Sequence, residues 1–354
     1  MTHLFVPGPV NVDPEVAAAQ TKEMLPHRSA EFEALFRGAE AKLRKLFYTE
    51  TRVFITASSG TGLHEAAVRN LAHNKVLSCV NGAFGKRWHD VALTNGKDVD
   101  LLTAEWDEPI SPDEVAEAMQ KEKYDIVTVV HNETSTGMMN PIKEIAAAVH
   151  AADPDTLVCV DAVSSLSGAR IEMDAWGVDM LLTSSQKCLA LPPGLGFAGV
   201  NDKAMARAAE VENRGWYFDL VRLENHRVKN STPATPAISL IYALDVQLDR
   251  IFEEGLDNRF ARHSAMAKKA QDWALAHDFE MFAPEGYRSQ TVTTIKNTPE
   301  VNVAEMNAFL VERGMRIANG YGPLKNETFR IGHMGETTLA DVDKLLEALE
   351  AYLG

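Results

Sequence analysis

Short apolar runs alternate with longer amphipathic segments along the chain up to about Gly199. Each run is rich in aliphatic residues and is bounded by glycine, proline or small polar residues, which is typical of buried strands. Because helical segments separate these runs, the pattern predicts βαβ units, and so an α/β fold with a mainly parallel sheet and helices on both faces. The runs expected to be strands are Arg52–Thr56, Val76–Val80, Ile126–Val130, Leu157–Asp161 and the run that starts at Val178 and ends in Ser184-Ser185.

The segments between these runs carry apolar residues at helical spacing. Asp13-Pro14 predicts a helix start, because an aspartate cap before proline suits a first turn. Residues Ala30–Phe47 predict a long helix with Phe32 on its apolar face. Two further helices are expected, one that begins near Leu63 and one over Ile142–Ala151.

The pattern changes after about Gly199. A helix-rich stretch follows, with a long helical segment from Ile238 to Phe252 and beyond. We expect an N-terminal arm at residues 1–15, a large domain at 16–250 and a smaller C-terminal α/β domain at 251–354. The strands and helices expected in the smaller domain are Thr291–Ile295, Val303–Arg313, Met315–Ile317, Thr328–Gly332 and Leu339–Leu353.

Composition narrows the class of protein. The chain has 354 residues, 45% hydrophobic and 24% charged, as in an ordinary soluble enzyme, and a net charge of −15 argues against general binding to nucleic acid. Cys79, Cys159 and Cys188 lie in or beside apolar runs, which indicates buried free thiols in a reducing compartment. No Cys/His spacing suggests a metal site, and we see neither a signal peptide nor a membrane span. We therefore expect a soluble, cytoplasmic protein without a metal.

One lysine stands out by its position. Lys187 follows a buried run that ends in small hydroxyl residues, at the sheet edge where α/β enzymes bind ligands. A lysine among apolar neighbours deprotonates more readily, and its free amine can attack a carbonyl. A lone lysine is usually a surface residue, but a second buried run ends in the carboxylate of Asp161. A Schiff-base lysine and an aspartate able to hold a pyridinium nitrogen are the pair that pyridoxal phosphate (PLP) chemistry requires.

Three other stretches offer weaker signals. The loop Ala57–Gly62 opens a helix, and its amides and hydroxyls at the positive helix end suit a phosphate. Phe84, between two glycines, either folds back on the core or is offered to a flat ligand. The opening Phe5–Asn11 is rigid and extended, and Gly8 lets the backbone approach another group closely. Each of these features alone is common in proteins without such a site.

Together these stretches resemble the class V aminotransferases of the PLP fold-type I superfamily, most closely the alanine–glyoxylate and serine–glyoxylate (serine–pyruvate) enzymes. The resemblance covers nearly the whole chain, from Pro7-Gly8-Pro9 to Phe329-Arg330-Ile331-Gly332. Its most specific motifs are Ser184-Ser185-Gln186-Lys187 with Pro192-Pro193-Gly194, and Val160-Asp161-Ala162-Val163. It implies a large domain with a mainly parallel sheet of the seven-stranded type.

The resemblance also implies roles for the matching residues. Lys187 carries the cofactor as a Schiff base, and Asp161 pairs with the pyridine nitrogen, which keeps the ring protonated. Arg330 grips the substrate α-carboxylate, and Gly8 lies beside the substrate. The other cofactor contacts are the phosphate cup of Ser59, Gly60 and Thr61, the phosphate contact Gln186, the ring neighbours Phe84 and Val163, and Thr134 near the phenolic oxygen.

In this family a partner subunit completes the active site from the stretch around Ser231-Thr232-Pro233, so the resemblance implies a homodimer. This sequence departs from the alanine–glyoxylate pattern there. Ser231 stands where that group carries a tyrosine, and Thr232 fits the phosphoserine aminotransferases better. Which of Ser231, Thr232 or Thr235 reaches the phosphate stays open.

The resemblance implies transfer of an amino group from alanine or serine to glyoxylate or pyruvate, by a ping-pong aldimine mechanism. Three other substrates stay open. Aspartate is the substrate assigned to a thermophilic-type subgroup of this size. His131–Met138 also resembles the 2-aminoethylphosphonate transaminases, and His27-Arg28 resembles the phosphate-binding pair of phosphoserine aminotransferases.

Two interpretations outside the aminotransferases share the fold. A PLP lyase such as a cysteine desulfurase needs a nucleophilic cysteine on a loop in the C-terminal half, and all three cysteines lie at or before Cys188. A non-catalytic binding module would have lost Lys187, Asp161 or Arg330, and all three are present.

Overall fold

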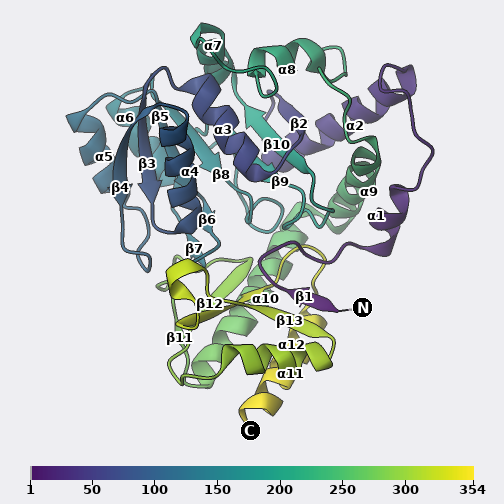
Figure 1. Ribbon diagram of the computed structural model, residues 1–354, viewed down its shortest axis with the longest axis vertical. Coiled ribbons are helices and arrows are strands. Elements are labelled where there is room, and N and C mark those ends of the chain that lie inside the picture. The colour runs from purple at the N-terminus through teal and green to yellow at the C-terminus, as the bar shows by residue number, and fades with distance from the viewer. Residues whose placement is uncertain (1) are drawn as a thin grey trace.

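The computed structural model describes residues 2–354, which form two main sheets with helices packed against them (Figure 1). The larger sheet occupies the upper part of Figure 1, and the smaller sheet lies below it beside both chain ends. Among the described residues, no helix is long and apolar enough to cross a membrane.

The larger sheet has seven strands and is mainly parallel, which confirms the predicted fold class. β10 alone in this sheet runs against its neighbours β2 and β9, while the other pairs are parallel. Strands β5, β8 and β9 are buried along their whole length, as expected for strands covered on both faces. In spatial order the strands are β2 (Val53–Ala57), β10 (Leu195–Val200), β9 (Met180–Ser184), β8 (Leu157–Asp161), β5 (Ile126–Val130), β3 (Lys75–Val80) and β4 (Asp98–Thr103).

Two of these strands are missing from the sequence prediction. β4 is the edge strand, and it mixes aspartates with partly exposed aliphatic residues, so its apolar run is weak. β10 contains two glycines, which give little strand signal. At Gly199 a Cβ atom would lie 2.6 Å from the sulfur of Met173, so close packing excludes a larger residue there.

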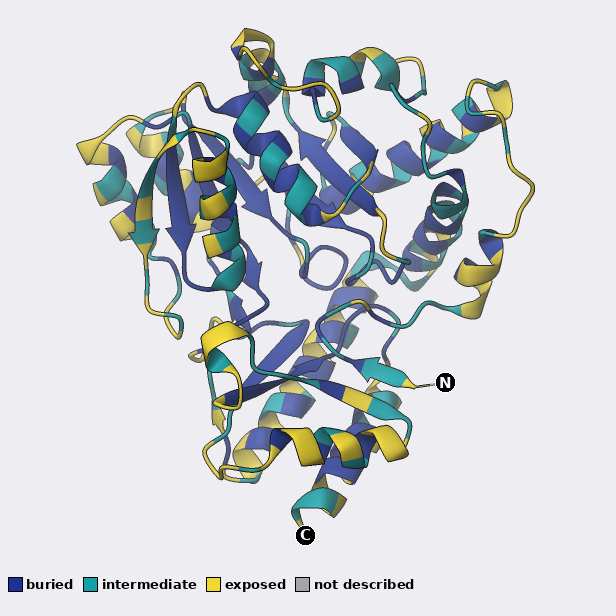
Figure 2. Ribbon diagram, in the orientation of Figure 1, coloured by how far each residue is buried: buried dark blue, intermediate teal, exposed yellow. Residues whose placement is uncertain are grey.

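Helices cover both faces of the larger sheet, and alternate strand residues enter opposite cores. Val158 and Val160 pack with α2, α5, α6 and α9, whereas Leu157 and Cys159 pack with α3, α4, α7 and α8. Figure 2 shows the central strands buried, the edge strand β4 partly exposed, and helices whose outer sides are exposed. The helices of this layer are α1 (Pro14–Ala19), α2 (Ala30–Phe47), α3 (Gly60–Leu71), α4 (Ala83–Thr94), α5 (Pro112–Lys121), α6 (Ile142–Ala152), α7 (Asp202–Glu210), α8 (Leu220–Arg227) and α9 (Ile238–Glu254).

Two helix predictions need correction. The helix expected near Leu63 begins at Gly60, because the small residues of the preceding loop form its first turn. The long segment expected beyond Phe252 is two helices, α9 and α10 (Leu256–Ala276), separated at Gly255. Gly255 has a φ of +82°, a conformation that favours glycine and ends the first helix.

The smaller sheet contains the first residues of the chain. β1 pairs in parallel with β13, and Phe5 is buried in the core of this sheet, so the extended opening is built into it. The domain division expected near residue 250 falls within α9, close to Gly255, and the division into domains stays a prediction. In spatial order the strands are β1 (His3–Phe5), β13 (Met315–Asn319), β14 (Thr328–Gly332), β12 (Val292–Lys296) and β11 (Glu280–Met281), covered by α10, α11 (Val303–Glu312) and α12 (Leu339–Leu353), while β6 (Asn132–Glu133) and β7 (Met138–Met139) form a separate hairpin.

Candidate active site

A pocket of about 220 Å³ opens at the carboxyl ends of β8 and β9, beside the first turn of α3. Ligands bind at this edge of an α/β sheet because the strand ends there leave loops and helix N-termini free. The structure brings segments far apart in sequence to this pocket. The predicted site residues that line it are Gly8, Ser59, Gly60, Thr61, Phe84, Thr134, Asp161, Val163, Gln186 and Lys187.

Lys187 is the buried cation of the pocket, with 9% of its surface exposed. Its Nζ donates a hydrogen bond to the main-chain oxygen of Pro7 and lies 6.0 Å from the ring centroid of Phe84. Burial, with a smaller contribution from the charge of Arg330, lowers the pKa of Lys187 to about 8. The amine is therefore far easier to deprotonate near neutral pH than that of a surface lysine.

Gly8 packs directly against Lys187. It has a φ of +88°, and a Cβ atom at this position would lie 2.4 Å from Cδ of Lys187. Glycine is therefore the residue that fits this wall of the pocket. The predicted contact between Gly8 and the substrate stays a prediction.

The lowered pKa of Lys187 predicts how covalent capture of an aldehyde depends on pH. Only the free amine attacks a carbonyl, and its fraction rises as the pH passes through about 8. The rate at which cofactor-free protein attaches PLP should therefore rise up to about pH 8 and level off above it. Stopped-flow absorbance between about pH 6 and 10 would measure this, and a rate that keeps rising to about pH 10, as for an ordinary lysine, would contradict it.

Asp161 ends β8 and is almost fully buried. Its Oδ1 accepts a hydrogen bond from the N–H of Val163 at 2.7 Å, and its Oδ2 lies 2.7 Å from Nε2 of His64. The sequence prediction missed His64, because a single histidine in a helix matches no motif. The apolar neighbours of His64 in this amphipathic helix could have indicated that it points inward, because Leu63 and Ala66 are buried too.

The start of α3 forms a candidate anion site. The N-cap Ser59 makes no side-chain capping bond, so the amides of the first turn lack acceptors within the helix. The buried Oγ of Ser184, which lines the same pocket, has no hydrogen-bond partner within residues 2–354. A Cβ atom at Gly60 would lie 2.6 Å from Cγ2 of Val163, so glycine allows this close approach. An anionic group with several acceptor oxygens would satisfy these donors.

Arg330 lies in β14 of the smaller sheet and is not among the residues that line the pocket, but it bonds Thr134, which lines it. Its Nη1 donates to the main-chain oxygen of Thr134 at 3.1 Å, and its Nε and Nη2 donate to that of Asn319. Within the described residues it forms no ion pair with a carboxylate. Burial lowers the pKa of Arg330 to about 10, so the side chain is charged near neutral pH. Glu133 acts on Arg330 only from a distance beyond ion-pair contact, and a buried guanidinium without a directly paired carboxylate favours an anion from outside the chain.

Phe84 lies in the first turn of α4, and Glu133 fixes that turn. The Glu133 carboxylate accepts hydrogen bonds from the N–H groups of Phe84 and Gly85 at 2.9 and 3.0 Å. Burial raises the pKa of Glu133, although these bonds oppose the effect. The Phe84 ring contacts Tyr321, with centroids 5.5 Å apart, and Arg87 lies over it at 4.7 Å. These contacts hold an aromatic face in the pocket wall.

Ser231, Thr232 and Thr235 lie outside this pocket within one chain. Arg28 donates to the hydroxyl of Ser231 and, at 2.7 Å, to the main-chain oxygen of Thr232. The hydroxyl of Thr232 donates a hydrogen bond to the main-chain oxygen of Ala234 at 2.7 Å. These residues were expected to act from a partner subunit, and that role stays a prediction.

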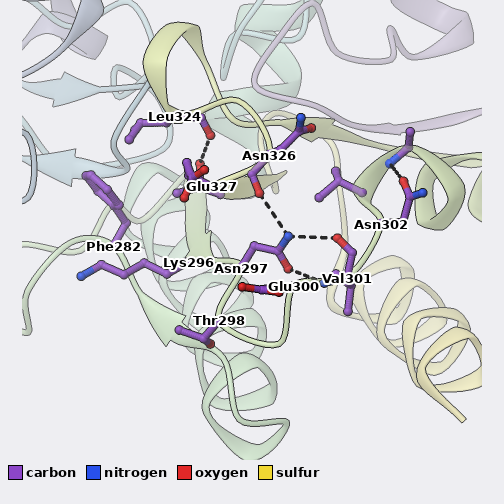
Figure 3. Close-up of a pocket in the computed structure, with 13 residues that line it drawn as sticks. Phe282, Lys296, Asn297, Thr298, Glu300, Val301, Asn302, Leu324, Asn326 and Glu327 are labelled. Atoms are coloured by element: carbon purple, nitrogen blue, oxygen red, sulfur yellow. Dashed lines mark hydrogen bonds between the residues drawn. The ribbon is translucent and has the colours of Figure 1, made fainter.

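A larger hollow of about 870 Å³ on the smaller sheet shares no lining residue with the Lys187 pocket (Figure 3). Asn297 lies at its centre and bonds the main-chain oxygens of Val301 and Asn326. Since its central amide already serves the fold and no predicted site residue lines it, this hollow offers no chemistry comparable to that of Lys187.

The three cysteines are buried and free. Burial raises the pKa of Cys188 to about 11 and that of Cys79 to about 12, which leaves them protonated and unreactive near neutral pH. This argues against a lyase that needs a nucleophilic cysteine. Among residues 2–354 no group of three His, Cys, Asp or Glu side chains could hold a metal ion.

The pocket fits PLP part by part. Free helix amides and the orphaned Ser184 hydroxyl suit its phosphate, and the Asp161 carboxylate suits its ring nitrogen. The buried amine of Lys187 suits its aldehyde, and the Phe84 ring suits its flat face.

Comparisons with known proteins agree with this fit. The family model "Aminotransferase class-V" matches residues 15–345. An uncharacterized aminotransferase of Methanocaldococcus jannaschii is 39% identical over 99% of this chain and 92% of its own length. A serine–glyoxylate aminotransferase of Methylorubrum extorquens is 36% identical over 94% of this chain and 86% of its own. The solved structure of an alanine–glyoxylate aminotransferase from Nostoc sp. has a TM-score of 0.94 at 30% identity, and covers 100% of this chain and 95% of that chain.

The fold and the pocket thus define a PLP-dependent enzyme of fold type I. The chain belongs to the class V aminotransferase family. It is a transaminase, and its cofactor is pyridoxal 5′-phosphate. The family, fold class, transaminase activity and cofactor expected from the sequence are confirmed, whereas the expected substrates stay a prediction.

Proposed function

We propose that this aminotransferase moves an amino group from alanine or serine to glyoxylate, with pyruvate as a further acceptor. The observation that carries the proposal is Arg330, a buried guanidinium without a carboxylate partner near Lys187, which suits a single α-carboxylate. A pocket of about 220 Å³ that also receives the cofactor favours a small substrate side chain. The relatives named serine–glyoxylate and alanine–glyoxylate aminotransferase support glyoxylate as the acceptor.

Each site residue predicted from the sequence has a proposed task. Lys187 holds the cofactor covalently, and Asp161 accepts a hydrogen bond from the ring nitrogen. In a homodimer, Ser231 or Thr232 of the partner subunit would add a phosphate contact, as the resemblance implies. The other assignments are the phosphate for Ser59, Gly60, Thr61 and Gln186, the ring faces for Phe84 and Val163, the phenolic oxygen for Thr134, and the substrate for Gly8 and Arg330.

The chain's own groups would orient the donor and move one proton. When bound, PLP supplies an electron sink that makes the Cα proton of an amino acid acidic. Arg330 orients the donor by its α-carboxylate, so that the Cα hydrogen faces Lys187. Lys187 would hold the cofactor through its aldehyde and, as a free amine, would take up the Cα proton and later give it back. A pKa of about 8 suits an amine that acts as base and then as acid near neutral pH. In the net reaction the donor amino acid and the acceptor keto acid would exchange amino and keto groups, and PLP would carry the amino group between them.

Half-reactions tested one donor at a time would check the substrate assignment. Alanine and serine should each discharge the PLP absorbance of the enzyme, and glyoxylate should restore it. Aspartate, phosphoserine and 2-aminoethylphosphonate, which has no α-carboxylate for Arg330, should react more slowly at the same concentration. A faster reaction with any of these three would replace the proposed donor, whereas the transaminase class would stand.

A further inference from the structure

We propose that His64 is a positioning residue for the cofactor, which acts through Asp161. Its imidazole would hold the Asp161 carboxylate charged and oriented, so that the carboxylate keeps the cofactor ring nitrogen protonated. The proposal rests on the function proposed above, in which Asp161 faces that nitrogen.

His64 and Asp161 form a buried pair that lines the cofactor pocket. They are 2% and 4% exposed, and Nε2 of His64 lies 2.7 Å from Oδ2 of Asp161. The proposed role of Asp161 requires an ionised carboxylate, which accepts hydrogen bonds and does not donate them, and in that state Nε2 of His64 carries the hydrogen. Nδ1 of His64 has no hydrogen-bond partner within residues 2–354, so the imidazole is engaged on the Asp161 side alone.

The protein fixes both members of the pair. The His64 ring stacks on Trp88, with centroids 4.4 Å apart and planes 13° from parallel, and Nε1 of Trp88 donates to the main-chain oxygen of His64. The other oxygen of Asp161 is held by the N–H of Val163 at 2.7 Å. Each carboxylate oxygen has two lone pairs, so Asp161 keeps acceptor capacity for a ring N–H. The protein's own groups thus orient the carboxylate.

The pair has a consequence for the ring nitrogen. In a buried site a charge-assisted hydrogen bond favours the ionised carboxylate, and an ionised carboxylate favours a protonated partner. The other charged groups that face Asp161 do not replace His64. Burial lowers the pKa of His131 to about 4, so that imidazole is neutral near pH 7, and it bonds Ser165 instead. Lys187 is committed to the cofactor aldehyde.

Four single variants of the PLP-loaded enzyme, and one double variant, test the proposal. His64→Leu removes the hydrogen bond, and His64→Gln offers an amide N–H of similar reach, whereas His64→Asn is too short to reach Oδ2. Asp161→Asn removes the charge that His64 is proposed to serve. Nitrogen-15 NMR of PLP labelled at the ring nitrogen reports ring protonation directly, and single-turnover rates with alanine report proton transfer.

We expect His64→Leu and His64→Asn to shift the nitrogen-15 signal toward the unprotonated ring. The single-turnover rate should fall about tenfold or more, as for loss of a hydrogen bond to a charged group. His64→Gln should restore most of both readouts. Adding His64→Leu to Asp161→Asn should change neither further, because His64 acts through Asp161.

The outcomes distinguish the role proposed for His64 from the role proposed for Asp161. An unchanged nitrogen-15 signal in Asp161→Asn would refute the proposed role of Asp161 itself. A shifted signal in Asp161→Asn with a wild-type signal in His64→Leu would overturn the His64 proposal alone. Equal losses in all three His64 variants, or additive losses in the double variant, would assign His64 a purely structural role. If His64→Leu does not fold, the contrast between His64→Gln and His64→Asn decides.

Discussion

Replacing Lys187 by alanine is expected to abolish covalent attachment of PLP and to stop transamination with every donor. Among the described residues that line the pocket, Lys187 is the one lysine, and its pKa is lowered to about 8, so the variant loses both the amine that attaches PLP and the proposed proton carrier. General base catalysis contributes about 10²- to 10⁴-fold, and the single-turnover rate should fall by at least that factor. The fold should persist, because burial of an ammonium disfavours the folded state and alanine removes that cost.

Lys86→Ala is the matched control for this variant. Lys86 lies near the pocket on α4, but it is exposed and pairs with Asp90. Its removal should leave the rate and the PLP absorbance unchanged. A Lys187→Ala protein that transaminates within about tenfold of the wild type would refute the catalytic assignment.

Arg330→Ala is expected to lower kcat/KM steeply for every α-amino acid and to leave PLP affinity nearly intact. The loss of a desolvated partner for a carboxylate corresponds to about 2–5 kcal/mol, or roughly 30- to 5,000-fold. PLP affinity should be spared because the hydrogen bonds of Arg330 within the chain go to main-chain oxygens of Thr134 and Asn319, outside the phosphate and aldehyde contacts. Steady-state kinetics with alanine and serine, and PLP titration of the cofactor-free protein, measure both effects.

Two further variants test whether the effect of Arg330→Ala comes from its guanidinium. Arg330→Lys keeps the charge but loses the planar fork, so its kcat/KM should lie between those of the alanine variant and the wild type. Arg316→Ala removes an exposed arginine from the neighbouring strand β13 and should change nothing. If Arg330→Ala lowered kcat/KM for alanine but not for serine, Arg330 would recognise the substrate side chain rather than the α-carboxylate.

The sequence predicts the parts of the fold in which local pattern and burial agree. β5 and β8 are continuous apolar runs, and they occur at the predicted residues. β4 and β10 could not be found this way, because one is a polar edge and the other depends on glycines that long-range packing requires. The parallel pairing of β1 with β13 joins segments from opposite ends of the chain, and no local sequence pattern predicts such a pairing.

The site residues likewise divide into those that local sequence pattern predicts and those that depend on long-range contacts. Lys187 and Asp161 were found because Asp161 ends one buried strand and Lys187 follows another, and the fold brings the ends of these strands together. His64 was not found, because its proposed role depends on Asp161, which lies 97 residues away in the sequence. The partial neutralisation of Lys187 was anticipated from burial, whereas the contribution of Arg330 depends on how the smaller sheet meets the larger.

The covalent link between Lys187 and the cofactor can be tested most directly by reduction and peptide mapping. Borohydride treatment of the yellow PLP-loaded enzyme should bleach it and fix a pyridoxyl group irreversibly to one lysine. Mass spectrometry of the digested protein should then place that group on the peptide that contains Ser184-Ser185-Gln186-Lys187. A pyridoxyl group on any other lysine, with Lys187 unmodified, would contradict the assignment of the active site.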